Sequence, residues 1–273
     1  MASQEPPKEV KVKLKSGHTL AYREAGSGPV VVFIHGSGPG ASGHSNFRHN
    51  YPLLAQKGYR CVVPDLIGYG GSSKPEDAQY ILDFFSNTLL ELIDHLGITR
   101  CTLVGNSLGG AIAMSIALQR PALVEKLVLM APGGVEPRWA YFRMPAMRQM
   151  VSTFIGTGFD RDSLTKIMTL LVHDPKHITP ELIDERLKAY QTQPKAVLAT
   201  MRVPDFTERL PEIACPVLGF WGVDDGFNPV SGAMKIVSAC KNARMILHAN
   251  CGHWVMVEYA DQFNRALLDF LGE

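Results

Sequence analysis

The chain has 273 residues, of which 46% are hydrophobic and 19% are charged, so it can bury one large core or two smaller ones. Its 27 basic and 26 acidic side chains leave a net charge of +1, which argues against a nucleic-acid-binding or membrane-surface protein. The N-terminal stretch lacks the apolar core of a secretory signal, and no apolar run approaches the roughly 18 residues of a membrane span. The 5 scattered cysteines form no CxxC pair, which favours reduced thiols in a cytoplasmic protein over disulfides or a metal site.

Eight segments have the pattern of β-strands. The first two have no helical pattern between them and are expected to form an antiparallel edge. The other six are mostly apolar runs, typical of buried strands. In chain order the eight segments lie within residues 10–14, 19–23, 29–36, 59–66, 101–107, 124–132, 216–222 and 243–250.

Helical patterns separate most of the later strands, and they cover residues 80–96, 108–119 and 254–271. Strands that alternate with helices form parallel β-α-β units. The pattern therefore predicts an α/β fold: a mostly parallel, eight-stranded sheet with helices on both faces.

One connection between strands is much longer than the others. It runs from residue 133 to residue 215, whereas ordinary connections have about 2–6 residues. Its clearest helical pattern is "ITPELIDERLKAYQ", residues 178–191. We expect this interval to be an inserted helical lid, with residues 1–132 and 216–273 forming the core domain.

A serine stands where the strand at 101–107 meets the helix at 108–119. The pattern is Gly105-x-Ser107-x-Gly109, which is typical of a nucleophile elbow. Side chains two residues before and after such a serine would collide in the tight turn, and the helix N-terminus favours developing negative charge. The alternative is a glycine-rich turn in which the serine only caps the helix.

A serine hydroxyl is a weak nucleophile without a base, and downstream of an elbow serine the acid precedes the histidine. His253 follows the last strand, where a loop could carry it back over the sheet edge. The other downstream histidines are His173 and His177 in the expected lid and His248 within a strand. We therefore expect His253 to be the base.

The acid should follow a late strand, where it can accept the Nδ1–H of the histidine and fix its tautomer. Asp224 and Asp225 both follow the strand at 216–222, and Glu136 follows the strand at 124–132. Position in the chain favours the aspartates over Glu136 and leaves both aspartates open.

An oxyanion needs two backbone N–H donors. One is expected from Leu108, directly after the serine. The other is expected from Ser37, in the loop "HGSGPGASGHSNF", whose glycines let the backbone turn its amides inward. The alternative for this loop is a flexible surface segment.

Five motifs follow one another in the order found in α/β-hydrolases, and the chain resembles that family over nearly its whole length. They are "HGSGPGAS…SNF", "DLIGYGGSSKP", "GNSLGG", "WGVDDGFNP" and "CGHW". More narrowly, "HGSGPGA" followed by Ser45-Asn46-Phe47, with Asn106 before the serine and Trp254 after His253, resembles the meta-cleavage product hydrolases.

The resemblance implies a role for several residues. The family acid, which ends the W-G-x-x-D motif, corresponds to Asp225. The lid arginine that holds the substrate carboxylate corresponds to Arg186, although a solvent-exposed charged helix face is the alternative. Phe227 corresponds to an apolar wall of the acyl pocket. The residues around the dienoate correspond to Gly38, Asn46, Asn106 and Trp254, with loop stabilisation or core packing as their alternatives.

The function implied is a serine hydrolase without cofactor or metal. It would cleave a C–C bond in 2-hydroxy-6-oxohexa-2,4-dienoates, the ring-fission products of catechols, to 2-hydroxypenta-2,4-dienoate and a carboxylic acid. The resemblance also implies a homodimer or higher homo-oligomer that acts on a small molecule. A carboxylesterase or lactonase with the same triad is one alternative, and a non-catalytic ligand-binding protein of this fold is another.

Overall fold

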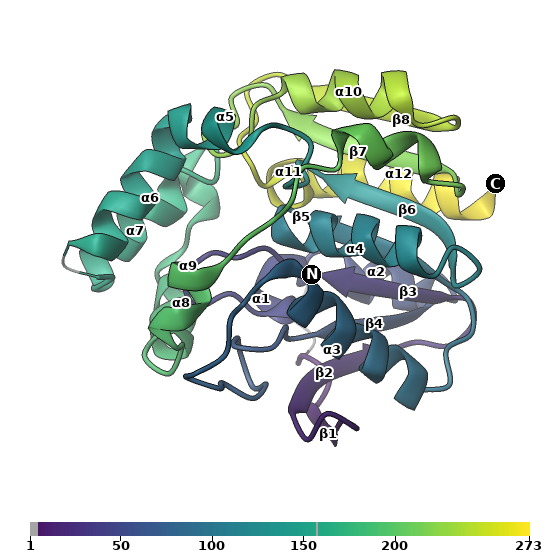
Figure 1. The fold of residues 1–273 in the computed structure, drawn as a ribbon, viewed down its shortest axis with the longest axis horizontal. Helices are drawn as coiled ribbons and strands as arrows, with labels where there is room; N and C mark the ends of the chain where they lie inside the picture. The colour runs from purple at the N-terminus through teal and green to yellow at the C-terminus, as the bar shows by residue number, and fades with distance from the viewer. Residues whose placement is uncertain (1–4, 157) are drawn as a thin grey trace.

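The computed structural model describes residues 5–156 and 158–273, in which eight strands form one sheet (Figure 1). Their order across the sheet is β1-β2-β4-β3-β5-β6-β7-β8. The strands are β1 (Val10–Lys13), β2 (Thr19–Ala25), β3 (Val30–Ile34), β4 (Arg60–Pro64), β5 (Cys101–Asn106), β6 (Val124–Met130), β7 (Val217–Gly222) and β8 (Ala243–His248). β2 pairs antiparallel with both β1 and β4, and the pairs from β4 to β8 are parallel, so the predicted mostly parallel sheet is confirmed.

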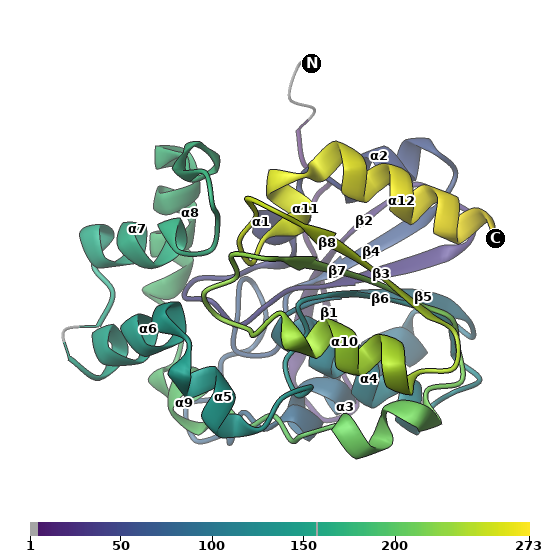
Figure 2. The ribbon, with the colours of Figure 1, turned by 90° about the horizontal axis from the view of Figure 1, so that it is seen from above.

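Helices cover both faces of the sheet. Figure 2 shows α2 and α12 on one face and α3, α4 and α10 on the other. The core helices are α1 (Gly43–Phe47), α2 (Tyr51–Gln56), α3 (Leu82–His95), α4 (Leu108–Gln119), α10 (Ser231–Ala239), α11 (Val255–Glu258) and α12 (Ala260–Gly272). Within residues 5–156 and 158–273, no helix combines the length and apolar character that a membrane crossing requires.

The strands contribute to both cores because successive side chains point to opposite faces. In β3, Val32 and Ile34 join the core under α3 and α4, whereas Val31 and Phe33 join the core under α2 and α12. Complete burial of such a side chain contributes about 1.5–3 kcal/mol. The continuous apolar runs in the sequence follow from this burial on both faces.

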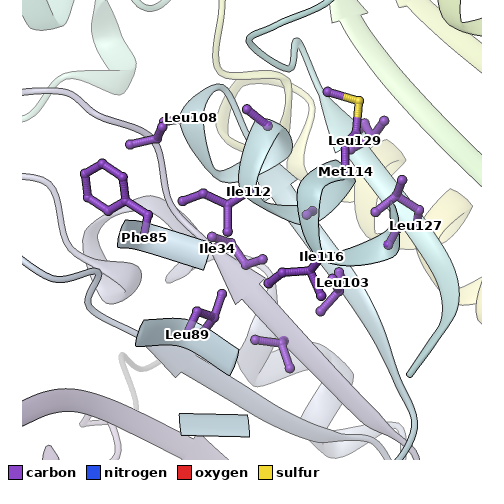
Figure 3. Packing of buried hydrophobic residues seen from close by; sticks show 14 of the residues in the cluster. Ile34, Phe85, Leu89, Leu103, Leu108, Ile112, Met114, Ile116, Leu127 and Leu129 are labelled. Atoms are coloured by element: carbon purple, nitrogen blue, oxygen red, sulfur yellow. The ribbon is translucent and has the colours of Figure 1, made fainter. Parts of the chain in front are cut away.

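The helix that follows Ser107 is the most deeply enclosed helix of the core. Figure 3 shows Ile112 and Ile116 of α4 packed between the sheet residues Ile34, Leu103 and Leu127 and the helix α3. Close packing on all sides fixes α4 firmly, so its N-terminus is a rigid support for residue 107.

The long connection between β6 and β7 forms a group of helices at the carboxyl ends of the parallel strands (Figure 1). They are α5 (Arg138–Arg143), α6 (Pro145–Ile155), α7 (Arg161–Thr169), η1 (Pro175–His177), α8 (Pro180–Tyr190) and α9 (Lys195–Thr200). The connection ends with η2 (Thr207–Glu212), which lies apart from this group and packs against α10 and the core. Side-chain caps define two of the helix starts: Asp160 accepts from Ser163 N in α7, and Thr179 accepts from Leu182 N in α8.

The helical pattern predicted over 254–271 is divided in the structure. α11 ends at Glu258, and α12 begins at Ala260 after a non-helical Tyr259 (φ −118°, ψ 40°). Tyr259 donates its hydroxyl hydrogen to Ala249 O at 2.9 Å. Neither glycine nor proline marks this break, so the sequence pattern carries no sign of it.

Candidate active site

Ser107 stands at a sharp turn between β5 and α4. Its backbone has φ 55° and ψ −116°, a strained conformation for a residue with a side chain. A Cβ at Gly105 would overlap the Gly109 carbonyl, and one at Gly109 would overlap the carbonyl of Ile34. The two glycines therefore permit the close approach of backbones that the elbow pattern predicts.

His253 and Asp225 form a buried pair behind this turn. His253 Nδ1 lies 2.7 Å from Asp225 Oδ2, and both side chains are almost completely buried. The other carboxylate oxygen accepts from Phe227 N at 2.7 Å and Asn228 N at 3.0 Å. The carboxylate is thus fixed in orientation and accepts a hydrogen bond from Nδ1–H, which leaves Nε2 of the imidazole to act as an acceptor.

The other candidates have different partners. Asp224 pairs with His173 at 3.0 Å, and both side chains are 46% exposed. Glu136 accepts from Lys235 Nζ at 2.7 Å and from a serine hydroxyl of α10, and His248 stacks on an aromatic ring at the sheet edge. The arrangement therefore favours Asp225 and His253.

Ser107 and His253 line the same cavity, between the carboxyl ends of the strands and the inserted helices. Most of the residues singled out in the sequence also line it: Ser37, Gly38, Asn46, Asn106, Arg186, Phe227 and Trp254. Asp225 and Leu108 are not in its lining, because Asp225 lies behind the imidazole and Leu108 would take part only through its amide.

Two amides beside Ser107 have no acceptor in the part of the chain that the structure describes: Ser37 N–H and Leu108 N–H. Leu108 is the first residue of α4, where an amide has no intrahelical partner. Both amides are therefore available to an oxyanion.

His35, which the sequence reasoning left without a role, holds the peptide that carries Ser37 N–H. Leu66 N donates to its Nε2 at 3.0 Å, so the ring proton is on Nδ1 and is donated to Gly36 O at 2.7 Å. Burial lowers the pKa of His35 to about 3, so the ring is neutral. The only sign of this supporting role in the sequence is that a histidine stands directly before the first glycine of the loop.

Two further contacts hold the same loop. Tyr69 donates its hydroxyl hydrogen to Ser37 O at 3.1 Å, and Gly40 N donates to Gln193 Oε1 at 2.9 Å. Gly40 has φ +62°, and a Cβ there would overlap the backbone carbonyl of Arg186. These contacts join distant segments, and no local pattern could have revealed them.

Arg186 is a buried cation in the lining of the cavity. Its side chain on α8 donates to Pro39 O at 3.3 Å and Asn46 Oδ1 at 3.2 Å and lies 5.2 Å from the Trp254 ring centre. Burial lowers the pKa of Arg186 to about 10, so it stays charged at neutral pH. The structure therefore excludes the alternative of a solvent-exposed helix face.

No carboxylate pairs with Arg186 among the described residues. The adjacent Glu185 pairs instead with Arg48, and Asp184 pairs with Arg161. The Nε atom of Arg186 is buried and has no hydrogen-bond partner in the described chain. A buried charge without a counter-ion is costly, so the geometry calls for an anionic ligand beside it.

Two asparagines connect the arginine to the elbow. Asn46 Nδ2 lies 3.4 Å from Asn106 Oδ1, and Asn106 Nδ2 donates to Met130 O at 3.3 Å and His253 O at 3.5 Å. Both asparagines are buried and line the cavity. They can therefore stabilise the loops and contact a ligand at the same time.

The lining contributed by the inserted helices, apart from Arg186, is apolar. It comes from α6, α7 and the segment that follows α7, and the residue two beyond the acid adds to it. The side chains are Met147, Met150, Ile167, Met168, Leu171 and Phe227. The cavity thus combines a cation, an apolar wall, and Ser107 with His253 in its lining. No cluster of three or more metal-ligating side chains occurs in the described ranges.

The sheet order and the site geometry are those of a hydrolase of the α/β class. The family model for the alpha/beta hydrolase fold matches residues 29–260. The chain belongs to the α/β-hydrolase family, and within it to the group that contains the 2-hydroxy-6-oxo-dienoate hydrolases.

Three similar proteins support this placement. The chain is 33% identical to a 2-hydroxy-6-oxo-6-phenylhexa-2,4-dienoate hydrolase of Comamonas testosteroni, over 94% of this chain and 92% of that one. It is 36% identical to a 2-hydroxy-6-oxononadienedioate/2-hydroxy-6-oxononatrienedioate hydrolase of Paraburkholderia phymatum, over 92% and 90%. A solved meta-cleavage product hydrolase of Pseudomonas fluorescens IP01 superposes with a TM-score of 0.84, at 26% identity and 98% coverage of both chains.

Proposed function

We propose that this protein hydrolyses the C5–C6 bond of a 2-hydroxy-6-oxohexa-2,4-dienoate, with Ser107 as nucleophile, His253 as base and Asp225 as the acid. The observation that carries the proposal is the buried Arg186, which pairs with no carboxylate of the described residues and lines the cavity that also holds Ser107 and His253. A planar guanidinium suits the C1 carboxylate of such a substrate, because it can donate two parallel charge-assisted hydrogen bonds.

The first stage moves protons and forms the acyl-enzyme. The dienol ketonises as the proton of its 2-hydroxyl group is transferred to C5, with His253 as the carrier. Ser107 Oγ then attacks C6 and gives its proton to His253, whose imidazolium is stabilised by Asp225. The oxyanion at C6 accepts from the amides of Ser37 and Leu108.

The second stage breaks the carbon–carbon bond and releases the acid. The electron pair of the C5–C6 bond passes to C5 and is delocalised to the oxygen at C2, so the leaving group departs as a dienolate and takes a proton from His253. A water molecule then gives a proton to His253 and attacks the acyl-serine. The tetrahedral intermediate collapses to the carboxylic acid, and the Ser107 oxygen leaves and takes the proton back from His253. One water is consumed, and the products are 2-hydroxypenta-2,4-dienoate and a carboxylic acid.

The lining of the cavity supports an uncharged, apolar substituent at C6, such as an alkyl or phenyl group. The apolar wall presents methionine, isoleucine, leucine and phenylalanine side chains, and Arg186 is the only Lys or Arg in the lining formed by the described residues. A second carboxylate at C6 would be buried there without a partner, at a cost of several kcal/mol. This resembles the named substrate of the phenyl relative more than that of the dioate relative.

We also propose how the parts of the chain are arranged around the substrate. Residues 133–215 act as a lid over a core formed by residues 1–132 and 216–273, and Gly38, Asn46, Asn106, Phe227 and Trp254 surround the substrate. A homodimer or higher homo-oligomer and a cytoplasmic location remain predictions, which light scattering and cell fractionation can check.

The experiment compares a 6-phenyl dienoate with the p-nitrophenyl ester of the same acyl group. We expect the dienoate to be bleached with the higher kcat/KM, because only it carries a carboxylate for Arg186. A far higher kcat/KM for the ester would make the protein a carboxylesterase. Absence of turnover together with absence of fluorophosphonate labelling at Ser107 would make it a binding protein.

A further inference from the structure

Glu258 is a partly buried acid at the end of α11, and its carboxylate accepts three backbone hydrogen bonds. One oxygen accepts from Gly252 N at 2.6 Å. The other accepts from His173 N at 2.7 Å and Asp174 N at 3.1 Å. Hydrogen bonds to an ionised acceptor are stronger than those between neutral groups, so this carboxylate joins two segments firmly.

The two segments it joins belong to the candidate active site. Gly252 directly precedes His253, in the loop after β8. His173 and Asp174 directly follow the segment whose Leu171 forms part of the cavity wall. Glu258 therefore connects the inserted helices to the loop that carries the base.

The backbones of these segments are already in contact. Trp254 N donates to Leu171 O at 3.1 Å. A Cβ at Gly252 would lie 2.7 Å from Leu171 O and 2.9 Å from the Cα of Val172. Because the packing is this close, the loop that carries His253 cannot shift without moving the Leu171 segment of the cavity wall. The Glu258 carboxylate therefore fixes the two segments together.

We propose that Glu258 is a positioning residue that holds His253 and the Leu171 wall in one rigid unit and so sets the distance from the base to Ser107. One Glu258 oxygen accepts from Gly252 N, and the other accepts from His173 N and Asp174 N, which requires two acceptor oxygens on one side chain. A glutamine has one acceptor oxygen, so its NH2 group must face either the Gly252 amide or the His173 and Asp174 amides. One of the two segments is then released.

A second side-chain link from the His173 segment, to the loop after β7, supplies the control. His173 Nδ1 and Asp224 Oδ2 are 3.0 Å apart, and both side chains are 46% exposed. Exposed ion pairs contribute little, so His173→Ala removes a side-chain contact of this segment without releasing it. Its labelling rate and kcat are expected to stay within about twofold of the parent.

The test is Glu258→Gln, with the rate of fluorophosphonate labelling at Ser107 and the kcat and KM for a dienoate as readouts. We expect labelling and kcat to fall about tenfold and KM to change less than threefold, because positioning errors affect the reacting atoms and leave the carboxylate contacts at Arg186 intact. The downfield proton NMR signal of His253 Nδ1–H is expected to weaken or shift.

The proposal rests on the proposed function only in taking His253 as the base of Ser107. Labelling does not depend on C–C cleavage, so a parent protein that is labelled but bleaches no dienoate would overturn the function and leave this inference testable. Parent-like labelling and kcat in Glu258→Gln, with only a lower Tm, would overturn the inference. Should that variant fail to fold, Glu258→Asp takes its place, because it keeps the charge but is one methylene shorter. It is expected to show the same selective loss of labelling and kcat. Labelling and kcat at the parental rate would contradict the inference.

Discussion

Arg186 combines a functional gain with a cost in stability. Its guanidinium is buried and no carboxylate pairs with it within the described residues. Apolar replacement of a buried charge is often neutral or stabilising, whereas the loss of a buried charge pair with a ligand costs about 2–5 kcal/mol. A methionine at position 186 would have a length similar to that of the arginine side chain and would carry no charge.

We therefore expect Arg186→Met to lower kcat/KM for a dienoate by about a hundredfold or more while Tm stays level or rises. Steady-state kinetics and thermal unfolding measure the two effects. Turnover of an uncharged p-nitrophenyl ester should be nearly unaffected. Lys188→Met, at an exposed position on the same helix, is the control, and an equal loss in both variants would contradict the assignment.

At the level of single residues, the sequence indicated most of the cavity but not its supports. The elbow pattern and chain order pointed to Ser107 and His253, because their local signals are strong. Asp224 and Asp225 could not be separated by local reasoning, since the turn after β7 decides which one reaches the imidazole. His35 and Glu258 went unassigned because their partners lie in other segments.

Two inserted helices determine the chemistry of the apolar wall of the cavity. Met147 and Met150 on α6 and Ile167 and Met168 on α7 face the cavity. Methionine side chains are flexible, so this wall can adapt to apolar groups of different shape. It offers no partner for a carboxylate.

A cation placed in this wall should change the preference. We expect Met150→Lys to raise kcat/KM for a dienoate with a carboxyethyl group at C6, relative to the 6-phenyl substrate, by about tenfold, because a charge-assisted bond contributes about 1.5–3 kcal/mol. Competition assays with the two substrates give the ratio directly. Gln149→Lys places the same charge on the exposed side of α6, and an equal change there would contradict the assignment of this wall to the C6 substituent.

Elements with a strong local pattern could be predicted from the sequence, and the others could not. The last six strands are mostly apolar runs bounded by turn residues, and α4 was predicted with its observed bounds, 108–119. In the insertion only the region of α8 was predicted, because its proline start and threonine cap are local signals. The helices α5, α6 and α9 have no side-chain cap, and the capping box of α7 at Asp160 and Ser163 is a local signal that was not used.

The stability of the whole molecule should depend on pH through its buried histidines. Burial lowers the pKa of His35 to about 3 and that of His44 to about 4, from the usual 6.5. Between these values and pH 6.5 the unfolded chain binds more protons than the folded chain. The free energy of unfolding therefore falls as the pH drops below about 6.5.

We expect His35→Gln to reduce this acid loss by up to about 1.4 kcal/mol per pH unit, while the variant is less stable than the parent at pH 7 because a ring hydrogen bond is lost. Urea unfolding at pH 7 and at pH 5 measures the change. His95→Gln, at an exposed position in α3, should keep the parental slope. A parental slope in His35→Gln would show that another group causes the loss.

At the scale of the molecule, the fold class followed from alternation of strands and helices, and the insertion followed from its length. The order of the strands in the sheet did not, because β4 lies between β2 and β3 and this crossing leaves no local pattern. The approach of α8 to the loop after β3 was equally hidden, and this approach brings Arg186 to Asn46.

The proposed function requires a covalent role for the Ser107 hydroxyl in breaking a carbon–carbon bond. The most direct measurement is the bleaching rate of a dienoate by the parent protein and by Ser107→Ala under single-turnover conditions. We predict that the variant still binds the substrate but bleaches it at least a thousandfold more slowly. Bleaching by the variant at the parental rate would contradict the account.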